Sequence, residues 1–246
     1  MPAESGTGPG AGSAAGRLQN VPTVVQSVTI VPMRKLVRFL VWTVVIVGAI
    51  IGLARLTAVR WWRIPTNDPY LEASVSPTLR GGDLILLWRL TAPEFGDLVL
   101  CPEPGAPERV VVGRIVAEGN DRITVKGTGF TVNDKSAEAE RACTPKTFET
   151  DHPGTGEPVE QFCQIETIRG TSHMRGSIPG SHPAPSTVSQ EVPPGNVFLL
   201  SDNRLFPYDS RDYGSVPLDS CKETVFFRLV GIKGYLDGET RFTFIQ

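Results

Sequence analysis

Ser74 begins a short segment, Ser74-Val75-Ser76-Pro77-Thr78-Leu79, that follows soon after a long hydrophobic stretch. A serine hydroxyl is a poor nucleophile at its own pKa and needs a nearby base that takes its proton. Farther along the chain, Ser201-Asp202-Asn203-Arg204 is followed by Asp209-Ser210-Arg211 and then by Gly214-Ser215-Val216-Pro217. Side chains of these types could support hydrolysis by a serine if the fold brings them together.

Candidates for the base are few. His152, His173 and His182 all lie in one irregular stretch, and an imidazole that titrates near neutral pH could reach the serine from a loop. Their spacing singles out none of them, and each could equally be an exposed loop residue. Lys126 is expected to be a solvated strand residue, and Arg114 cannot act as a base because its guanidinium stays protonated.

The hydrophobic stretch predicts one transmembrane helix over residues 36–59, because a bilayer core needs about 20 apolar helical residues. Arg38 and Arg55 lie near its ends, where long basic side chains can reach the headgroups. Trp61 and Trp62 would lie at an interface, where indoles are common. A cleaved signal peptide or a buried core helix is the alternative, although a secretory hydrophobic region is shorter. Basic residues flank both ends equally, so charge does not orient the helix.

The rest of the chain predicts three further regions. Residues 1–33 are rich in Gly, Ala and Pro and are expected to form a disordered tail. Residues 60–246 are expected to form a mostly β, antiparallel domain, because short apolar runs alternate with turn signals. Within this domain residues 133–190 lose periodicity and are expected to be an irregular insertion.

The composition of the chain limits the classes of partner and cofactor that we expect. A net charge of −2 gives no broad basic face, so nucleic acid is not an expected partner. The four cysteines show no Cys-x-x-Cys spacing, and no metal or other cofactor is expected. A disulfide between Cys143 and Cys163 would close the irregular stretch, and one between Cys101 and Cys221 is a second option. Four buried thiols are the alternative.

The ordered set of segments resembles the type I signal peptidases. Residues 74–79 resemble that family's Ser-Met-x-Pro-Thr-Leu box, and Gly82-Asp83 follows at the usual distance. Residues 114–121 resemble the second half of Lys-Arg-Val-Ile-Gly-Leu-Pro-Gly-Asp. Residues 201–217 resemble Gly-Asp-Asn-Arg-x-x-Ser-x-Asp-Ser-Arg-x-x-Gly-x-Val-Pro, which is the most specific of these boxes.

The resemblance implies a fold, a location and partners. Such proteins are single-pass proteins of the inner (cytoplasmic) membrane, with a β-rich domain on the extracytoplasmic, periplasmic side. They are serine endopeptidases that remove signal peptides from exported preproteins, so the implied partners are these preproteins or their signal peptides and the lipid bilayer. The family's base is a lysine that burial keeps neutral.

Compared with the family pattern, this chain keeps the nucleophile and loses the groups around it. Ser74 matches the nucleophile, and Gly113 takes the position of the general-base lysine. Pro207 replaces the serine that orients the lysine, and Glu72 replaces the serine that helps to form the oxyanion hole. The matching residues that are expected to support the site are Arg114, Asp202, Arg204, Asp209, Ser210 and Arg211.

Two interpretations stay open. In the first, the chain still cleaves exported preproteins with an unusual base. In the second, it is a pseudopeptidase that keeps the groove and binds exported polypeptides, as an assembly factor or chaperone. Loss of a catalytic base typically costs several orders of magnitude in rate, so the three replacements favour weak or absent hydrolysis.

Overall fold

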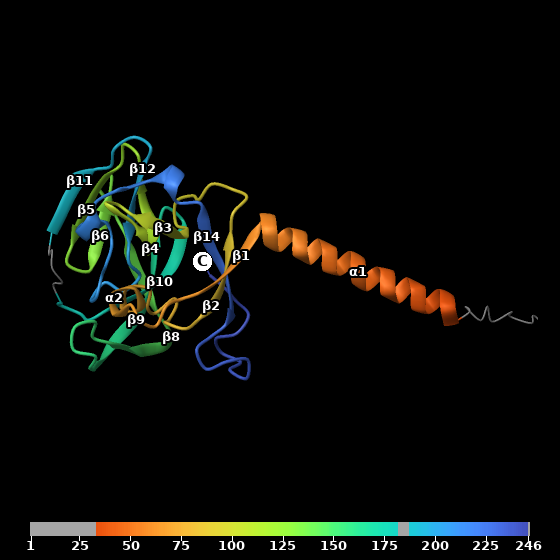
Figure 1. Ribbon diagram of the computed structural model, residues 1–246. Coiled ribbons are helices and arrows are strands. Elements are labelled where there is room, and N and C mark those ends of the chain that lie inside the picture. The colour runs from red at the N-terminus through yellow and green to blue at the C-terminus, as the bar shows by residue number, and fades with distance from the viewer. Residues whose placement is uncertain (1–32, 182–186, 246) are drawn as a thin grey trace, which may run out of the picture. The chain divides into compact units, whose positions relative to one another are not determined.

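The computed structural model describes residues 33–181 and 187–245 (Figure 1). The chain divides into two units, residues 1–46 and 47–246. The expected tail lies almost wholly outside the described residues. Helix α1 (Met33–Thr57) is the one described helix that is long and apolar enough to cross a membrane, and none of its side chains is buried. The predicted N-terminal apolar helix is therefore confirmed, with bounds slightly earlier than expected.

The larger unit is built on an antiparallel sheet with the strand order β1-β2-β14-β3-β4-β12-β13, and β15 pairs with β14. The mostly antiparallel β fold predicted from the sequence is confirmed. The strands of this sheet are β1 (Val59–Arg63), β2 (Leu84–Trp88), β3 (Leu98–Glu103), β4 (Ala106–Glu118), β12 (Asn196–Leu200), β13 (Val216–Pro217), β14 (Glu223–Val230) and β15 (Thr243–Phe244).

Two smaller antiparallel sheets complete the fold, in the orders β11-β5-β6-β7 and β10-β9-β8. The first contains β5 (Arg122–Lys126), β6 (Gly129–Val132), β7 (Lys135–Ser136) and β11 (Thr187–Glu191). The second contains β8 (Glu138–Asp151), β9 (Pro158–Ile168) and β10 (Thr171–Ser177). The helical elements are α2 (Pro69–Ser74), α3 (Ser210–Tyr213) and the 3₁₀ turn η1 (Leu218–Ser220).

The expectation that residues 133–190 are irregular is wrong for most of that segment. Strands β8, β9 and β10 form a regular sheet there, with few buried apolar residues. Its small core consists of Cys143, Phe148 and Cys163, with Ile165 and Met174 against it. Because so few side chains are buried, the sequence lacks the hydrophobic alternation that marks most strands.

Both disulfides form. Cys143 joins β8 to β9, and Cys101 joins β3 to Cys221, 120 residues later. Disulfides persist in oxidising compartments.

Helix α2 is short and has a clear start. Asp68 caps it by accepting a hydrogen bond from the Leu71 amide at 3.1 Å, and Pro69 occupies the first helical position, where it loses no hydrogen bond. Leu71 and Val75 pack into the apolar core that also contains Val112 of β4. Helix α2 also lies beside β8 (Figure 1), so the inserted sheet contacts the helix that carries Ser74.

Candidate active site

Ser74 is the last residue of α2, and its hydroxyl is already engaged. Its Oγ donates a hydrogen bond to the Leu71 carbonyl at 2.9 Å, and the residue is fully buried. Its backbone carbonyl accepts from the Asn203 amide at 3.0 Å. A substrate carbonyl could meet this Oγ only after the protein around it moved.

Gly113 lies in the middle of β4, opposite Val99 of β3. A Cβ at this position would lie 3.0 Å from the Cβ of Leu199 in β12, which is tighter than an ordinary contact. Neighbouring strand residues point to opposite faces, and it is Val112 that packs with the residues flanking Ser74. A lysine at 113 would therefore start towards Leu199, which would have to shift by a few tenths of an ångström.

Glu72 lies in the first turn of α2, and its carboxyl group covers Gly81 so closely that a Cβ there would overlap it. Burial raises the pKa of Glu72, and the negative charge of Asp151 adds to this rise. A carboxylate would repel a developing oxyanion, so Glu72 cannot do the work of a hydroxyl donor.

Pro207 has no side-chain donor or acceptor. It lies in a tight turn that other groups hold in place. The Asn203 Oδ1 accepts from the amides of Leu205 and Phe206, each at 3.0 Å, and the Ser201 Oγ accepts from the Tyr208 amide at 3.1 Å. The turn is thus built without any group that could orient a base.

Asp209, Ser210 and Arg211 form a support at the start of α3. The Asp209 carboxylate is fully buried, accepts from Arg211 Nε and Nη2 at 2.8 and 2.7 Å, and also accepts from the Ser201 amide at 2.9 Å. The Ser210 Oγ accepts from the Leu199 amide at 2.9 Å. These bonds fix the segment 199–211 against β12, which is a structural role.

Arg114 and Asp202 join three sequence segments. The guanidinium of Arg114 donates to both Asp202 carboxylate oxygens, at 2.9 and 2.8 Å, and to the Gly96 carbonyl at 2.7 Å. Thr78 also donates to Asp202. Burial alone would raise the pKa of Asp202, but Arg114 holds it below its usual value. The predicted grouping of these motifs is thus present in space.

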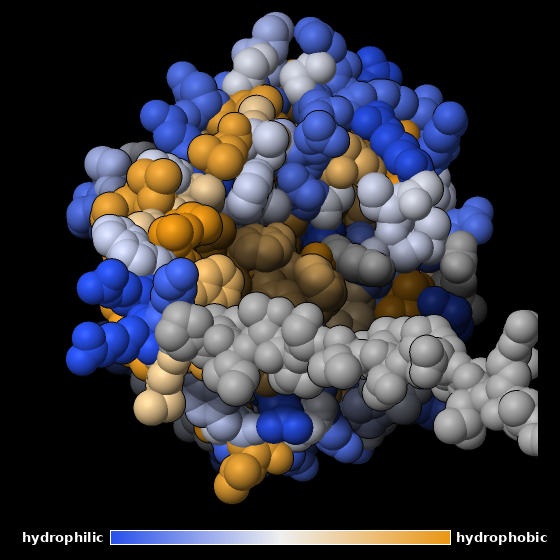
Figure 2. Space-filling model, turned by 90° about the vertical axis from the view of Figure 1, so that its right-hand side faces the viewer, coloured by the Kyte–Doolittle hydropathy of each residue, from blue (hydrophilic) through white to orange (hydrophobic). Residues whose placement is uncertain are grey.

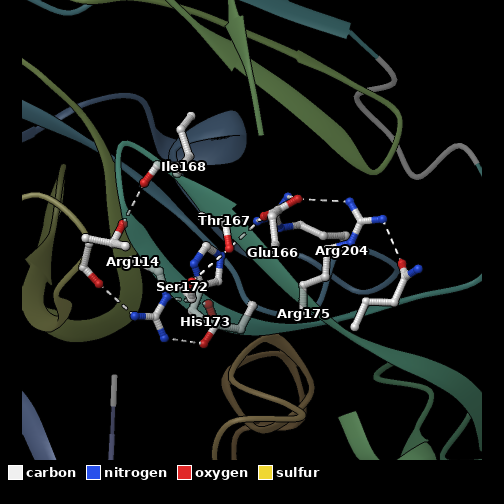
Figure 3. A network of polar contacts seen from close by, with 12 residues as sticks. Arg114, Glu166, Thr167, Ile168, Ser172, His173, Arg175 and Arg204 are labelled. Carbon is white, nitrogen blue, oxygen red and sulfur yellow. Dashed lines mark hydrogen bonds and ion pairs between the residues drawn. The ribbon is translucent and has the colours of Figure 1, made fainter. Parts of the chain in front are cut away.

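A second buried cluster, which the sequence did not predict, adjoins this one (Figure 3). Glu166 of β9 has no exposed surface, and it pairs with Arg204 and, at 2.9 Å, with Arg175 of β10. Burial alone would raise the pKa of Glu166, but Arg204 and the other neighbours bring it down to about 2. No sequence motif predicts the role of Glu166. The only signal in the sequence is Arg204, because a buried arginine needs a carboxylate partner.

The two histidines that the structure describes, His152 and His173, do not hydrogen-bond to Ser74. His173 is buried with its Nε2 3.2 Å from a Glu166 oxygen, and burial and Arg114 lower its pKa. His152 uses Nδ1 to accept from the amides of Gly154 and Thr155, at 3.0 and 3.2 Å, so its remaining nitrogen carries the proton. His182 lies outside the described residues. Lys126 is exposed at the end of β5. Within the described residues, neither a histidine nor a lysine hydrogen-bonds to Ser74.

The inserted sheet is joined directly to the segment that follows β12. The Gly176 amide donates to the Asp202 carbonyl, and the Arg204 amide donates to the Gly176 carbonyl, both at 2.8 Å. A Cβ at Gly176 would lie 2.4 Å from the Phe148 ring, so only glycine fits between that ring and this backbone. Through Asn203, strand β10 is therefore linked to the carbonyl of Ser74.

A cavity of about 660 Å³ opens between α2 and the turn that joins β8 to β9. Its walls include Glu72 and Ser76 on one side and Thr150, Asp151 and His152 on the other. Ser74 is not among the residues that line it. The open space beside the serine segment is therefore lined by charged, polar and apolar residues, and it is reached from Ser76 and not from Ser74.

The comparisons with known proteins agree with this geometry. The family described as "Signal peptidase, peptidase S26" matches residues 36–230, which is most of the chain and includes the segments around Ser74, Arg114 and Ser201. No curated protein matched the chain. Because this match covers most of the chain, the chain belongs to the signal peptidase family, peptidase S26.

Proposed function

We propose that this chain is a membrane-anchored signal peptidase homologue that binds exported polypeptides but does not hydrolyse them through Ser74. The observation that carries the proposal is the state of the Ser74 hydroxyl, which is buried and donates to Leu71. A nucleophile needs an accepting base at hydrogen-bonding distance, and this hydroxyl donates its hydrogen bond to a backbone carbonyl instead.

The surroundings of Ser74 support the same conclusion. Gly113 offers no base and a side chain there would press against Leu199, Pro207 offers no orienting hydroxyl, and Glu72 offers a carboxyl group in place of a hydroxyl donor. The scaffold behind these positions is intact, with Arg114 bound to Asp202 by two hydrogen bonds. Loss of the reactive groups from an intact scaffold is what a binding protein derived from an enzyme would display.

We further propose the arrangement in the membrane. Residues 1–33 would be a cytoplasmic tail, residues 36–59 a single span of the inner membrane, and residues 60–246 an extracytoplasmic domain. The two disulfides support this orientation, because such bonds persist outside the reducing cytoplasm.

Contact with lipid is also supported by exposed apolar side chains near the C-terminus. Figure 2 shows hydrophobic groups, which include the exposed apolar side chains of α1, between hydrophilic margins. Exposed apolar patches of this kind often mark an interaction surface. The exposed large hydrophobic residues of the C-terminal segment are Ile232, Tyr235, Leu236, Phe242 and Phe244.

The proposal is tested with the full chain reconstituted in lipid vesicles. The protein and its Ser74→Ala variant are incubated with a radiolabelled preprotein over a range of pH values. We expect no processing by either protein. Processing by the native chain that disappears in Ser74→Ala would overturn the proposal and establish an active peptidase.

Binding is measured separately by photo-crosslinking. A photoreactive amino acid is placed at Thr66, which lines the cavity, or at Lys126, which is exposed on the other small sheet. We expect capture of the preprotein from position 66 and not from position 126. Equal capture, or none, would contradict a binding role for the region around α2.

A further inference from the structure

Strand β10 of the inserted sheet meets residues 202–204 in a short contact, which we call the seam. A parallel bridge pairs Gly176 with Asn203 there. Its two backbone hydrogen bonds run from the Gly176 amide to the Asp202 carbonyl and from the Arg204 amide to the Gly176 carbonyl, each at 2.8 Å. The Asn203 amide in turn donates to the Ser74 carbonyl at 3.0 Å. The seam therefore connects the inserted sheet to the end of α2.

Buried polar atoms without a protein partner gather on both sides of this seam. In the part of the chain that the structure describes, ten buried side-chain nitrogen and oxygen atoms have no hydrogen-bond partner, and six of them belong to β8–β10. These six are Thr150 Oγ1, both amide atoms of Gln161, both ring nitrogens of His173, and Arg175 Nε. Asn203 Nδ2 is a seventh, on the other side. Because water satisfies such atoms once two surfaces part, they favour local opening of the seam over opening of the main sheet.

His173 is the titratable side chain that lies in this region without a hydrogen bond. It is 4% exposed, and neither ring nitrogen has a hydrogen-bond partner among the described residues. Its Nε2 lies 3.2 Å from a Glu166 oxygen, but without the geometry of a hydrogen bond. A neutral imidazole is tolerated in such a place more readily than a charged one, because burial disfavours the charged form.

The charges around His173 make a further proton costly. Five charged side chains from four parts of the fold form the cluster (Figure 3). They are Arg114 of β4, Glu166 of β9, Arg175 of β10, and Asp202 and Arg204 after β12. Three guanidinium groups and two carboxylates carry a net charge of +1, so protonation of His173 would raise the charge of the buried cluster to +2. Burial and the charge of Arg114 accordingly lower the pKa of His173, although Glu166 and Asp202 oppose this effect.

We propose that His173 is a pH switch that controls the seam. While the ring is neutral, β10 stays docked on residues 202–204; when a ring nitrogen takes up a proton from water, β10 is released. Release breaks the two hydrogen bonds of Gly176, and Asn203, which holds the Ser74 carbonyl, loses its support from the inserted sheet. The end of α2 would then move more freely. The switch itself does not depend on the proposed binding function, but it would regulate access to the same region.

The direction of the switch follows from the ordinary histidine pKa of 6.5. Since docking lowers the pKa of His173, protons bind preferentially to the released state. The docked state is therefore fully favoured above pH 6.5, and it loses stability relative to the released state as the pH falls below this value. Glu166 and Asp202 have lowered pKa values and stay ionised over this range, so the histidine provides the change of charge in the cluster.

The test measures backbone hydrogen exchange of the full chain in lipid nanodiscs, at residue resolution and without any ligand. Rates at about pH 7.5 and about pH 5.5 are corrected for the intrinsic effect of pH on exchange. We expect the protection of the Gly176, Asn203 and Arg204 amides to fall by about tenfold at the lower pH, which is one unit below the ordinary histidine pKa. The Val192 amide, which donates to the Asp121 carbonyl at 2.8 Å, is the internal control and should keep its protection.

Two matched variants assign the effect to one ring. His173→Gln keeps a neutral polar side chain and removes the titration, so the protection of the three seam amides should become equal at the two pH values. His152→Gln removes the other histidine that the structure describes, which lies in the turn between β8 and β9, and it should keep the native response. Near-UV circular dichroism checks the fold of each variant. If His173→Gln does not fold, the comparison with Val192 in the native chain still decides.

Several results would overturn the proposal. Protection of the seam amides that does not change with pH would do so, and so would an equal loss at Val192, which would indicate general instability in acid. A loss that persists in His173→Gln, or that disappears in His152→Gln, would assign the response to another group. Because no polypeptide is present, the result is independent of preprotein binding, which the crosslinking at position 66 decides separately.

Discussion

Ser74 stands in a segment that matches the family motif, but within the described residues no histidine or lysine hydrogen-bonds to its hydroxyl. Its hydrogen bond to the Leu71 carbonyl closes the last turn of α2, as serines near helix ends often do. The serine therefore has a structural explanation that requires no catalysis. Its presence in the family box is compatible with a chain that only binds.

We expect Ser74→Ala to have little effect. The variant loses one hydrogen bond of about 1 kcal/mol and leaves the Leu71 carbonyl in its helical turn, so the melting temperature should fall by only a few degrees. Differential scanning fluorimetry of the full chain in detergent measures this shift. Binding of preprotein should stay unchanged, and its loss would show that the hydroxyl contacts the ligand.

Gly113→Ala should destabilise the protein by about 1–3 kcal/mol, because the new Cβ would press against Leu199 in a packed core. The matched control is Gly129→Ala in β6, where the nearest atom to a new Cβ is 3.9 Å away. Chemical unfolding of the two variants gives the comparison. Equal stabilities of the two variants would show that Leu199 moves aside for a side chain at position 113 without a measurable cost.

The same contact bears on any attempt to restore catalysis. We expect Gly113→Lys combined with Pro207→Ser and Glu72→Ser to stay inactive, because Leu199 blocks the path of the lysine and Ser74 remains bonded within α2. Processing of a labelled preprotein is the measurement. Cleavage by this triple variant would prove that the site reorganises more readily than its packing implies.

At the scale of elements, the ion pairs of β4 differ sharply with position. Arg114 is fully buried and doubly bonded to Asp202, whereas Arg109, on the same strand, is half exposed and 3.3 Å from Glu103. Arg114→Gln should cost about 3–5 kcal/mol, because it leaves the Asp202 carboxylate buried without its charge partner. Arg109→Gln should cost far less, because solvent screens its pair with Glu103. Urea unfolding of both variants tests the difference; similar costs would contradict it.

Sequence reasoning succeeded where local patterns decide the structure. The apolar run of α1 and the strands of the main sheet follow from hydrophobic patterning, and the box residues Arg114 and Asp202 do meet in space. Sequence reasoning failed for residues 133–190, because β8–β10 bury few apolar groups and depend on a disulfide and on buried charges. The Glu166 cluster is a product of tertiary packing, which no local pattern encodes.

At the scale of the whole molecule, buried carboxylates couple stability to pH. The pKa of Glu166 is about 2 in the folded protein against 4.5 as its ordinary value, so the folded state favours the ionised form. The resulting stabilisation is fully present above pH 4.5 and is lost as the pH falls towards 2. It is on the order of 3 kcal/mol for this one group.

Unfolding with urea at pH 6 and at pH 3 measures this effect in the full chain. Glu166→Gln should be less stable at pH 6, because it leaves Arg204 and Arg175 without their charge partner, and it should lose less stability on acidification. Glu160→Gln, an exposed change on the same strand, should keep the native pH dependence. An unchanged dependence in Glu166→Gln would assign the acid sensitivity to other groups.

The link from Ser74 through Asn203 to Gly176 has a consequence for biogenesis. The chain is synthesised from its N-terminus, and the partner of the Ser74 carbonyl lies 129 positions later (203 minus 74). Until that partner has emerged, the Ser74 carbonyl and the backbone of Gly176 lack the hydrogen bonds that residues 202–204 supply, and contacts between such distant segments form slowly. A ribosome stalled before residue 203 would thus leave α2 and β10 without this link, so the protection of the Gly176 amide from hydrogen exchange, followed during translation, dates its formation.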